Sequence, residues 1–73
     1  MAKEIVEVPL TGKILSVNVK VGDKVKEDDV ICVLESMKME NPMVATVDGT
    51  ISDIRVKVEQ VVKPGDIIAI IDY

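Results

Sequence analysis

The sequence contains no histidine, phenylalanine or tryptophan, and only one cysteine and one tyrosine. Without histidine, the chain lacks the most frequent general base and the most frequent metal ligand of proteins. The lone Cys32 excludes an intrachain disulfide and a cysteine metal cluster. The single aromatic residue, Tyr73, offers no stacking surface for single-stranded nucleic acid. An independent enzyme is therefore the weakest interpretation, and we expect neither catalytic residues nor a metal site.

The charge pattern restricts the partners of the protein. The net charge is −4, and acidic and basic residues are interspersed along the chain. Such a surface does not attract nucleic acid or an anionic membrane. No apolar run approaches the length of about 18 residues that a membrane-spanning helix needs, and no secretion signal is recognisable. We therefore expect a cytoplasmic protein that binds no nucleic acid and does not insert directly into a membrane.

The distribution of apolar residues predicts strands throughout. Residues 17–21 and 54–58 alternate between apolar and polar side chains, which is the period of a half-buried strand. Other segments rich in β-branched residues are typical of strands as well: residues 5–9, 30–35, 43–47 and 67–72. Glycines and prolines between these segments mark expected turns: Gly12, Gly22, Pro42, Gly49, Pro64 and Gly65.

The chain contains an internal repeat. A shift of 37 positions superposes residues 11–35 on residues 48–72 without a gap, and Gly12 matches Gly49. Two copies of a unit of about 25 residues are too few for a solenoid. They suit a closed arrangement in which each half supplies strands to two facing sheets. We expect one all-β domain over residues 1–73, a flattened β-barrel or sandwich of two roughly four-stranded sheets with internal pseudo-two-fold symmetry.

The segment that joins the halves, residues 36–47, is expected to form a hairpin at one end of the molecule, with both termini at the other. Lys38 then lies at an exposed tip. A helix over residues 34–40 is disfavoured, because seven residues do not offset the cost of nucleation and Pro42 blocks extension. The tip is unusual for a hairpin, because tight turns favour residues that tolerate positive φ, such as Asn-Gly, and residues 36–39 include none.

Two interpretations of this tip compete. In the simpler one, Lys38 is a solvated charge and the neighbouring Met37 and Met39 fill core space. A hairpin tip, however, leaves little core for two methionines. Exposed methionine makes adaptable apolar contacts, which would let a partner grip the segment.

At these residues the sequence resembles a known family. The segment Glu-Ser-Met-Lys-Met-Glu at residues 35–40 is similar to the attachment motif of biotin carboxyl carrier domains, in the biotin/lipoyl attachment family. Lipoyl domains share the fold and the hairpin lysine but usually flank it with Asp. The resemblance covers nearly the whole chain and includes residues 9–12, 21–25, 44–50 and 64–66.

Three positions depart from the family pattern. Thr11 stands where the family prefers proline, Asp28 where a turn glycine is frequent, and Glu59 at the counterpart of Gly22. A non-glycine residue at positive φ costs about 1 kcal/mol, so these positions are expected to strain the turns. The repeats align without an insertion, and we therefore expect no protruding thumb.

The resemblance implies that Lys38 accepts biotin, as a covalent cofactor, through an amide bond made by a biotin protein ligase. A protonated amine is not nucleophilic, so the ligase must supply the base, and the chain is a non-catalytic substrate. The loaded domain would act as a swinging arm between a biotin carboxylase and a carboxyltransferase of a biotin-dependent carboxylase, decarboxylase or transcarboxylase. As an isolated domain it is expected to be a monomer. The resemblance places ligase recognition at four residues: Glu35, Met37, Met39 and Glu40.

Two alternatives belong to the same fold. A lipoyl carrier of an oxo-acid dehydrogenase or of glycine cleavage is the nearer one, and Met37 and Met39 argue against it. An unmodified structural domain, as in membrane-fusion adaptors, is the other, but those domains sit in longer coiled-coil chains. Cys32, which lies between Ile31 and Val33, is interpreted as a small core residue and not as a nucleophile.

Overall fold

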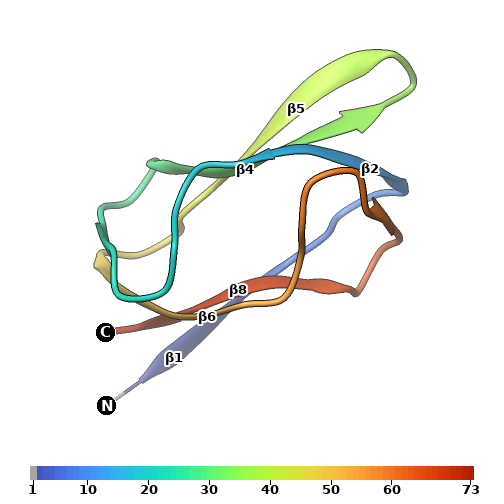
Figure 1. The fold of residues 1–73 in the computed structure, drawn as a ribbon. Coiled ribbons are helices and arrows are strands. Elements are labelled where there is room, and N and C mark those ends of the chain that lie inside the picture. Colours follow the sequence, from blue (N-terminus) through green and yellow to red (C-terminus); the bar gives the residue numbers. More distant parts are fainter. Residues whose placement is uncertain (1) are drawn as a thin grey trace.

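The structure is a computed structural model, and it describes residues 2–73. Met1, the first residue of the expected domain, lies outside the described part. Residues 2–73 form eight strands in two four-stranded antiparallel sheets and no helix (Figure 1), which confirms the all-β prediction. The strands are β1 (Lys3–Glu7), β2 (Gly12–Val17), β3 (Lys24–Val25), β4 (Val30–Ser36), β5 (Met39–Val44), β6 (Gly49–Ile54), β7 (Val61–Val62) and β8 (Ile67–Asp72).

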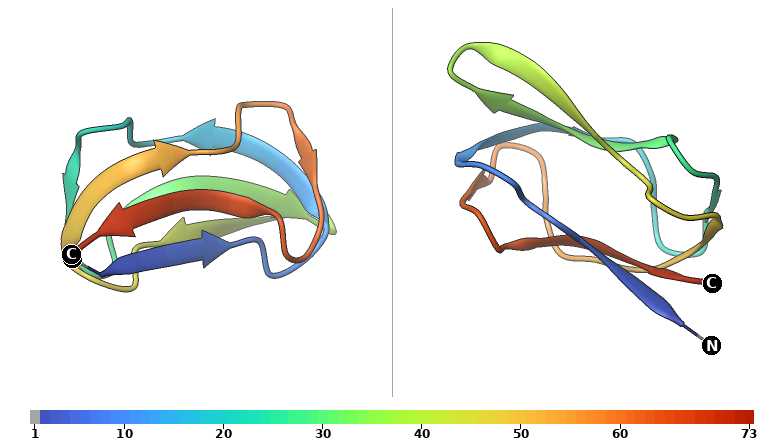
Figure 2. Two further views of the ribbon diagram at one scale, coloured as in Figure 1. Left: turned by 90° about the horizontal axis from the view of Figure 1, so that it is seen from below. Right: turned by 180° about the vertical axis from the view of Figure 1, so that it is seen from behind.

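The sheets have the orders β1-β8-β6-β3 and β5-β4-β2-β7, and they face each other across the core. Figure 2 shows them as two curved layers. In residues 2–73, no helix is both long enough and apolar enough to span a membrane. The largest side chains of the core are fully buried and come from both halves: Ile14, Ile31, Leu34, Ile51, Ile68 and Ile71.

The backbone hydrogen bonds repeat with the offset of 37 residues that the sequence shows. Gly22 N–H donates to the Ile51 carbonyl at 2.8 Å, and Glu59 N–H donates to the Ile14 carbonyl, also at 2.8 Å. The register shift in the β2–β4 pair between Ile14 and Ser16 has its counterpart in the β6–β8 pair. These equivalences confirm the pseudo-two-fold symmetry.

The symmetry also relates the two ends of the molecule. Ala2 and Tyr73 exchange two backbone hydrogen bonds of 3.0 Å, and their counterparts are Met39 and Ser36, which face each other in the β4–β5 hairpin. The chain ends therefore lie at one end and the hairpin lies at the other, as expected (Figure 1).

The strands predicted at residues 17–21 and 54–58 are wrong. β2 ends at Val17 and β6 ends at Ile54, and the residues that follow cross from one sheet to the other. Val19 still packs against the core, whereas Val21 is 60% exposed in a turn. The alternation of apolar and polar residues therefore comes from an extended segment that crosses between the sheets. One side of this segment faces the core, but its backbone does not pair with a neighbouring strand.

Several residues expected in turns lie in strands. Pro42 belongs to β5, an edge strand that needs no N–H on its free side. Gly12 and Gly49 begin β2 and β6. A methyl group on Gly12 would overlap the carbonyl oxygen of Glu35, and the same overlap occurs between Gly49 and Asp72. These two glycines allow close approach of neighbouring strands.

The turn positions behave as their sequence predicts. Gly22 and Gly65 have positive φ values of 96° and 93°. Asp28 and Glu59, which stand where glycine was expected, have φ values of 75° and 76°. The positive φ predicted at these two positions is confirmed, whereas Thr11, the third departure from the family pattern, does not have a positive φ.

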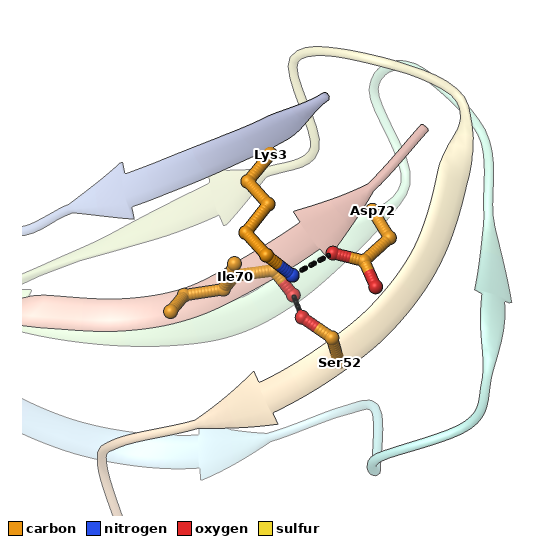
Figure 3. Close-up of polar contacts among 4 residues, drawn as sticks. All are labelled: Lys3, Ser52, Ile70 and Asp72. Atoms are coloured by element: carbon orange, nitrogen blue, oxygen red, sulfur yellow. Dashed lines mark hydrogen bonds and ion pairs between the residues drawn. The ribbon is translucent and has the colours of Figure 1, made fainter. Parts of the chain in front are cut away.

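The terminal end of the sandwich is held by an ion pair. The Lys3 ammonium donates to Asp72 Oδ1 at 2.7 Å across β1 and β8 (Figure 3). Beside this pair, the Ser52 hydroxyl donates to the carbonyl oxygen of Ile70 at 3.2 Å. The hydrogen bond from Lys3, together with its positive charge, lowers the pKa of Asp72.

We expect this pair to make stability depend on pH. A lowered pKa means that the folded chain binds the proton less readily than the unfolded chain, so the pair stabilises the fold above the ordinary Asp pKa of about 3.9. The contribution is lost as the pH falls through the lower pKa of the folded state. Urea unfolding at about pH 6 and about pH 3 should show a smaller acid-induced loss in Asp72→Asn than in the native chain. Equal losses in both proteins would contradict this assignment.

Candidate functional site

Lys38 lies in a two-residue turn at the tip of the β4–β5 hairpin. Ser36 and Met39 form the last pair of the ladder, and Met37 and Lys38 connect them. Their φ values are 53° and 63°. Positive φ at both central residues defines a type I′ turn, whose twist matches that of the flanking strands.

The hairpin therefore adopts the turn that Asn-Gly favours, but with two residues that disfavour it. Left-handed geometry costs about 1–2 kcal/mol for each such residue. The ladder below the turn offsets this cost, because β4 and β5 are paired from Val30 and Val44 up to the tip, and Leu34 of β4 is fully buried. The Asn41 side-chain amide also donates to the Met39 carbonyl at 3.2 Å.

Relief of this strain should be measurable. We expect Met37→Asn to raise the free energy of unfolding by about 1 kcal/mol, because asparagine tolerates the left-handed region. Urea unfolding measures the change, and Met39→Asn provides a matched control within a strand, where no gain is expected. Destabilisation by Met37→Asn would show that the Met37 side chain stabilises the tip.

The side chains of the tip are open to solvent. Met37 is 92% exposed and Met39 is 67% exposed, so neither fills core space. Lys38 is also exposed, and its ammonium makes no hydrogen bond or ion pair with any of residues 2–73. The tip thus presents an accessible primary amine between two apolar side chains.

The two glutamates of the motif face each other across the hairpin. Glu35 of β4 pairs with Glu40 of β5, and neither forms an ion pair within the described part of the chain. Lys13 lies opposite Glu35 on the other side, but its ammonium contacts Glu59 at 3.3 Å. Like charges directly opposite one another destabilise a sheet, so the arrangement gives no advantage to the fold.

The other candidate features of the described residues are the cysteine, possible metal ligands and a surface hollow, and none of them adds to the site at Lys38. Cys32 is fully buried in β4, and burial raises the pKa of its thiol to about 11, which agrees with its interpretation as a core residue. Among residues 2–73 no group of three or more acidic, cysteine or histidine side chains could hold a metal ion. A surface hollow beside Lys24 and Thr50 lies between β3 and β6, away from the hairpin.

Gly12 is a site residue that we did not predict. It lies against Glu35, one pair below the turn of the hairpin, and it lets β2 approach β4 closely. The signal in the sequence is its identity with Gly49 in the repeat, although a glycine between predicted strands is more typical of a turn. The described residues thus define a class of protein: a two-sheet barrel that presents one lysine on a short, strained hairpin.

Comparisons with known proteins agree with this class. The family described as "Biotin-requiring enzyme" matches residues 4–71. "Biotinylated protein TB7.3 homolog" of Mycobacterium leprae is 43% identical over 93% of this chain and 96% of its own length. "Biotin carboxyl carrier protein" of Streptococcus mutans is 50% identical over 80% of this chain and 45% of its own length.

The urea carboxylase of Kluyveromyces lactis contains the same fold, with a TM-score of 0.91 and 30% sequence identity over 99% of this chain and 6% of that chain. The match to the family over most of the chain decides the classification. The chain belongs to the biotin/lipoyl attachment family and is a biotinyl domain, with biotin as its covalent cofactor.

Proposed function

We propose that a biotin protein ligase attaches biotin to Lys38, and that the loaded domain carries a carboxyl group from a biotin carboxylase to a carboxyltransferase. The observation that carries this proposal is the position of Lys38, exposed in the two-residue turn between Ser36 and Met39. An amide bond to biotin needs an accessible primary amine with space around it, and the tip supplies both. The printed names of the S. mutans and K. lactis proteins support a role in carboxylation.

Each residue of the tip has a proposed part. Lys38 supplies the amine nitrogen and, after modification, the tether. Met37 and Met39 supply apolar contacts to the ligase, because they are exposed beside the lysine. Glu35 and Glu40 add a negative charge on each strand, which the ligase can recognise. We infer a non-catalytic role, since these residues bind and present the amine while the ligase supplies the base.

The paired hairpin determines where the tether of the biotin begins. When bound, biotin accepts and delivers the carboxyl group, and the protein determines where that happens. A tethered group reaches an effective concentration of the order of millimolar at a nearby site without tight binding. The paired strands β4 and β5 hold Lys38 beyond the core, so the tether starts from a fixed point at one end of the barrel (Figure 1).

The test is the intact mass of the protein after incubation with a biotin protein ligase, ATP and biotin. We expect one biotinyl group on the native chain and none on Lys38→Arg, which keeps the charge and the length of the side chain. Trypsin mapping should locate the group on Lys38. Modification of Lys38→Arg, or no modification of the folded native chain, would overturn the assignment, and lipoate with a lipoate ligase would be tried next.

A further inference from the structure

The strand β1 has one unpaired edge. It pairs with β8, and within residues 2–73 no strand pairs with its other side. Ala2 and Tyr73 exchange both of their backbone hydrogen bonds, and such pairs alternate along an antiparallel ladder. Lys3 and Ile5 therefore lie in the intervening pairs, and their N–H and C=O groups point toward the free edge.

The side chains along this edge would complement the same side chains of a second, antiparallel β1 strand. Glu4 and Val6 lie opposite the buried Ile71 and Ala69, so they face the interior, and Ile5 belongs to the outer face. Ile5 is 50% exposed, with Lys3 two residues before it and Glu7 two residues after it. A two-fold axis through Ile5 would place each Lys3 opposite a Glu7 and the two isoleucines side by side.

The symmetry-related edge of β5 provides an internal comparison. Pro42 stands 37 residues from Ile5, at the equivalent position, and it has no N–H to donate. Glu40 and Val44 replace Lys3 and Glu7, so opposite charges are absent there. Proline lacks the N–H that a pairing strand would need, and it protects an edge against pairing. The edge of β5 is thus protected against pairing. The equivalent edge of β1 keeps its backbone donors, and its side chains match those of a second, antiparallel copy of β1.

We propose that two copies of this chain associate through antiparallel pairing of their β1 strands. The pairing would join the two β1-β8-β6-β3 sheets into one continuous sheet with an isologous contact. A contact of about five residues on each side falls short of the roughly 1,200–2,000 Å² of a stable interface, so the association is weak and depends on concentration. This proposal departs from the monomer that the sequence led us to expect.

The geometry keeps both lysines accessible. β1 runs from the end with the termini toward the end with the hairpin (Figure 2). Two antiparallel β1 strands therefore direct the two Lys38 hairpins to opposite ends of the pair. The proposed association is independent of biotin attachment, and it is tested without the ligase.

Sedimentation equilibrium of the native chain tests the association. Between about 10 μM and about 1 mM, a range that covers weak binding, the average mass should rise from 8.0 kDa toward twice that value. Ile5→Pro should keep the monomer mass throughout, because it removes the central N–H donor. The equivalent Pro42 shows that the fold accepts proline there, and circular dichroism confirms folding. A constant monomer mass of the native chain, or association of folded Ile5→Pro equal to the native chain, would overturn the proposal.

A charge exchange tests the register. Lys3→Glu places two acidic residues opposite each other in each proposed contact, and Glu7→Lys places two basic residues opposite each other. Because Lys3→Glu also removes the ion pair with Asp72, circular dichroism confirms that both variants are folded. Each variant alone should remain a monomer at about 1 mM, whereas an equimolar mixture should associate as well as the native chain. Amide chemical shifts of a labelled variant should then change in residues 3–7. A mixture that associates no better than its separate components would contradict the pairing.

Discussion

Gly12→Ala is expected to lower the free energy of unfolding by about 3 kcal/mol, at the upper end of the usual cost of overpacking. The added methyl group would overlap the carbonyl oxygen of Glu35 and would lie 2.8 Å from Cδ1 of Leu34. Neither atom belongs to the free end of a flexible exposed side chain. β2 and β4 must therefore separate at Glu35, next to the tip of the lysine hairpin, and their ladder must weaken.

Two matched variants separate the causes. Gly49→Ala creates the same overlap with Asp72 at the opposite end of the barrel, so its cost in stability should be similar. Gly22→Ala meets no neighbouring atom within 4 Å, and only its φ of 96° opposes the methyl group. Its cost should be smaller, about 1–2 kcal/mol. Urea unfolding gives all three values, and a Gly12→Ala cost no larger than that of Gly22→Ala would contradict the steric explanation.

The two close-approach glycines should differ in function. Gly12 contacts the residue three positions before Lys38, whereas Gly49 contacts the strand that leads to the C-terminal end. Under conditions where both alanine variants are folded, Gly12→Ala should slow biotin transfer by the ligase, and Gly49→Ala should leave its rate close to that of the native chain. Equal rates would show that the ligase tolerates displacement of the strand at Glu35.

Leu34→Ala is the second large effect, with an expected loss of about 2–5 kcal/mol in the free energy of unfolding. Leu34 is fully buried in β4, opposite Ile14 of β2 and Asn41 of β5. Its removal leaves a cavity under the hairpin. A domain of this size has a total stability near the lower end of about 5–15 kcal/mol, so the variant approaches the limit of folding.

Ile71→Ala is the matched control, because Ile71 is the counterpart of Leu34 in β8 and is equally buried. The losses should agree within about 1 kcal/mol, and urea unfolding should give similar slopes for both variants. Limited proteolysis should then distinguish them, with faster cleavage near Lys38 only in Leu34→Ala. A loss below about 1 kcal/mol in Leu34→Ala would contradict the assigned core.

The sequence predicted the architecture correctly through its repeat. An offset of 37 residues required two equivalent halves, and the β-branched segments required sheets, so the two-sheet barrel and the exposed position of Lys38 followed. The sequence did not predict the boundaries of β2 and β6. Alternation of apolar residues indicates which side of a segment faces the core. It does not indicate whether the backbone of that segment forms hydrogen bonds with a neighbouring strand.

The sequence by itself determined the family, because the residues around Lys38 and the repeat are local patterns that need no coordinates. Only the tertiary structure decided how the tip is built. Turn propensity argued against positive φ at Met37 and Lys38, yet the pairing of β4 with β5 and the burial of Leu34 impose it. Only the fold, likewise, places Gly12 against Glu35. Both features depend on contacts between segments distant in sequence, whose summed energy exceeds the local preference of a single residue.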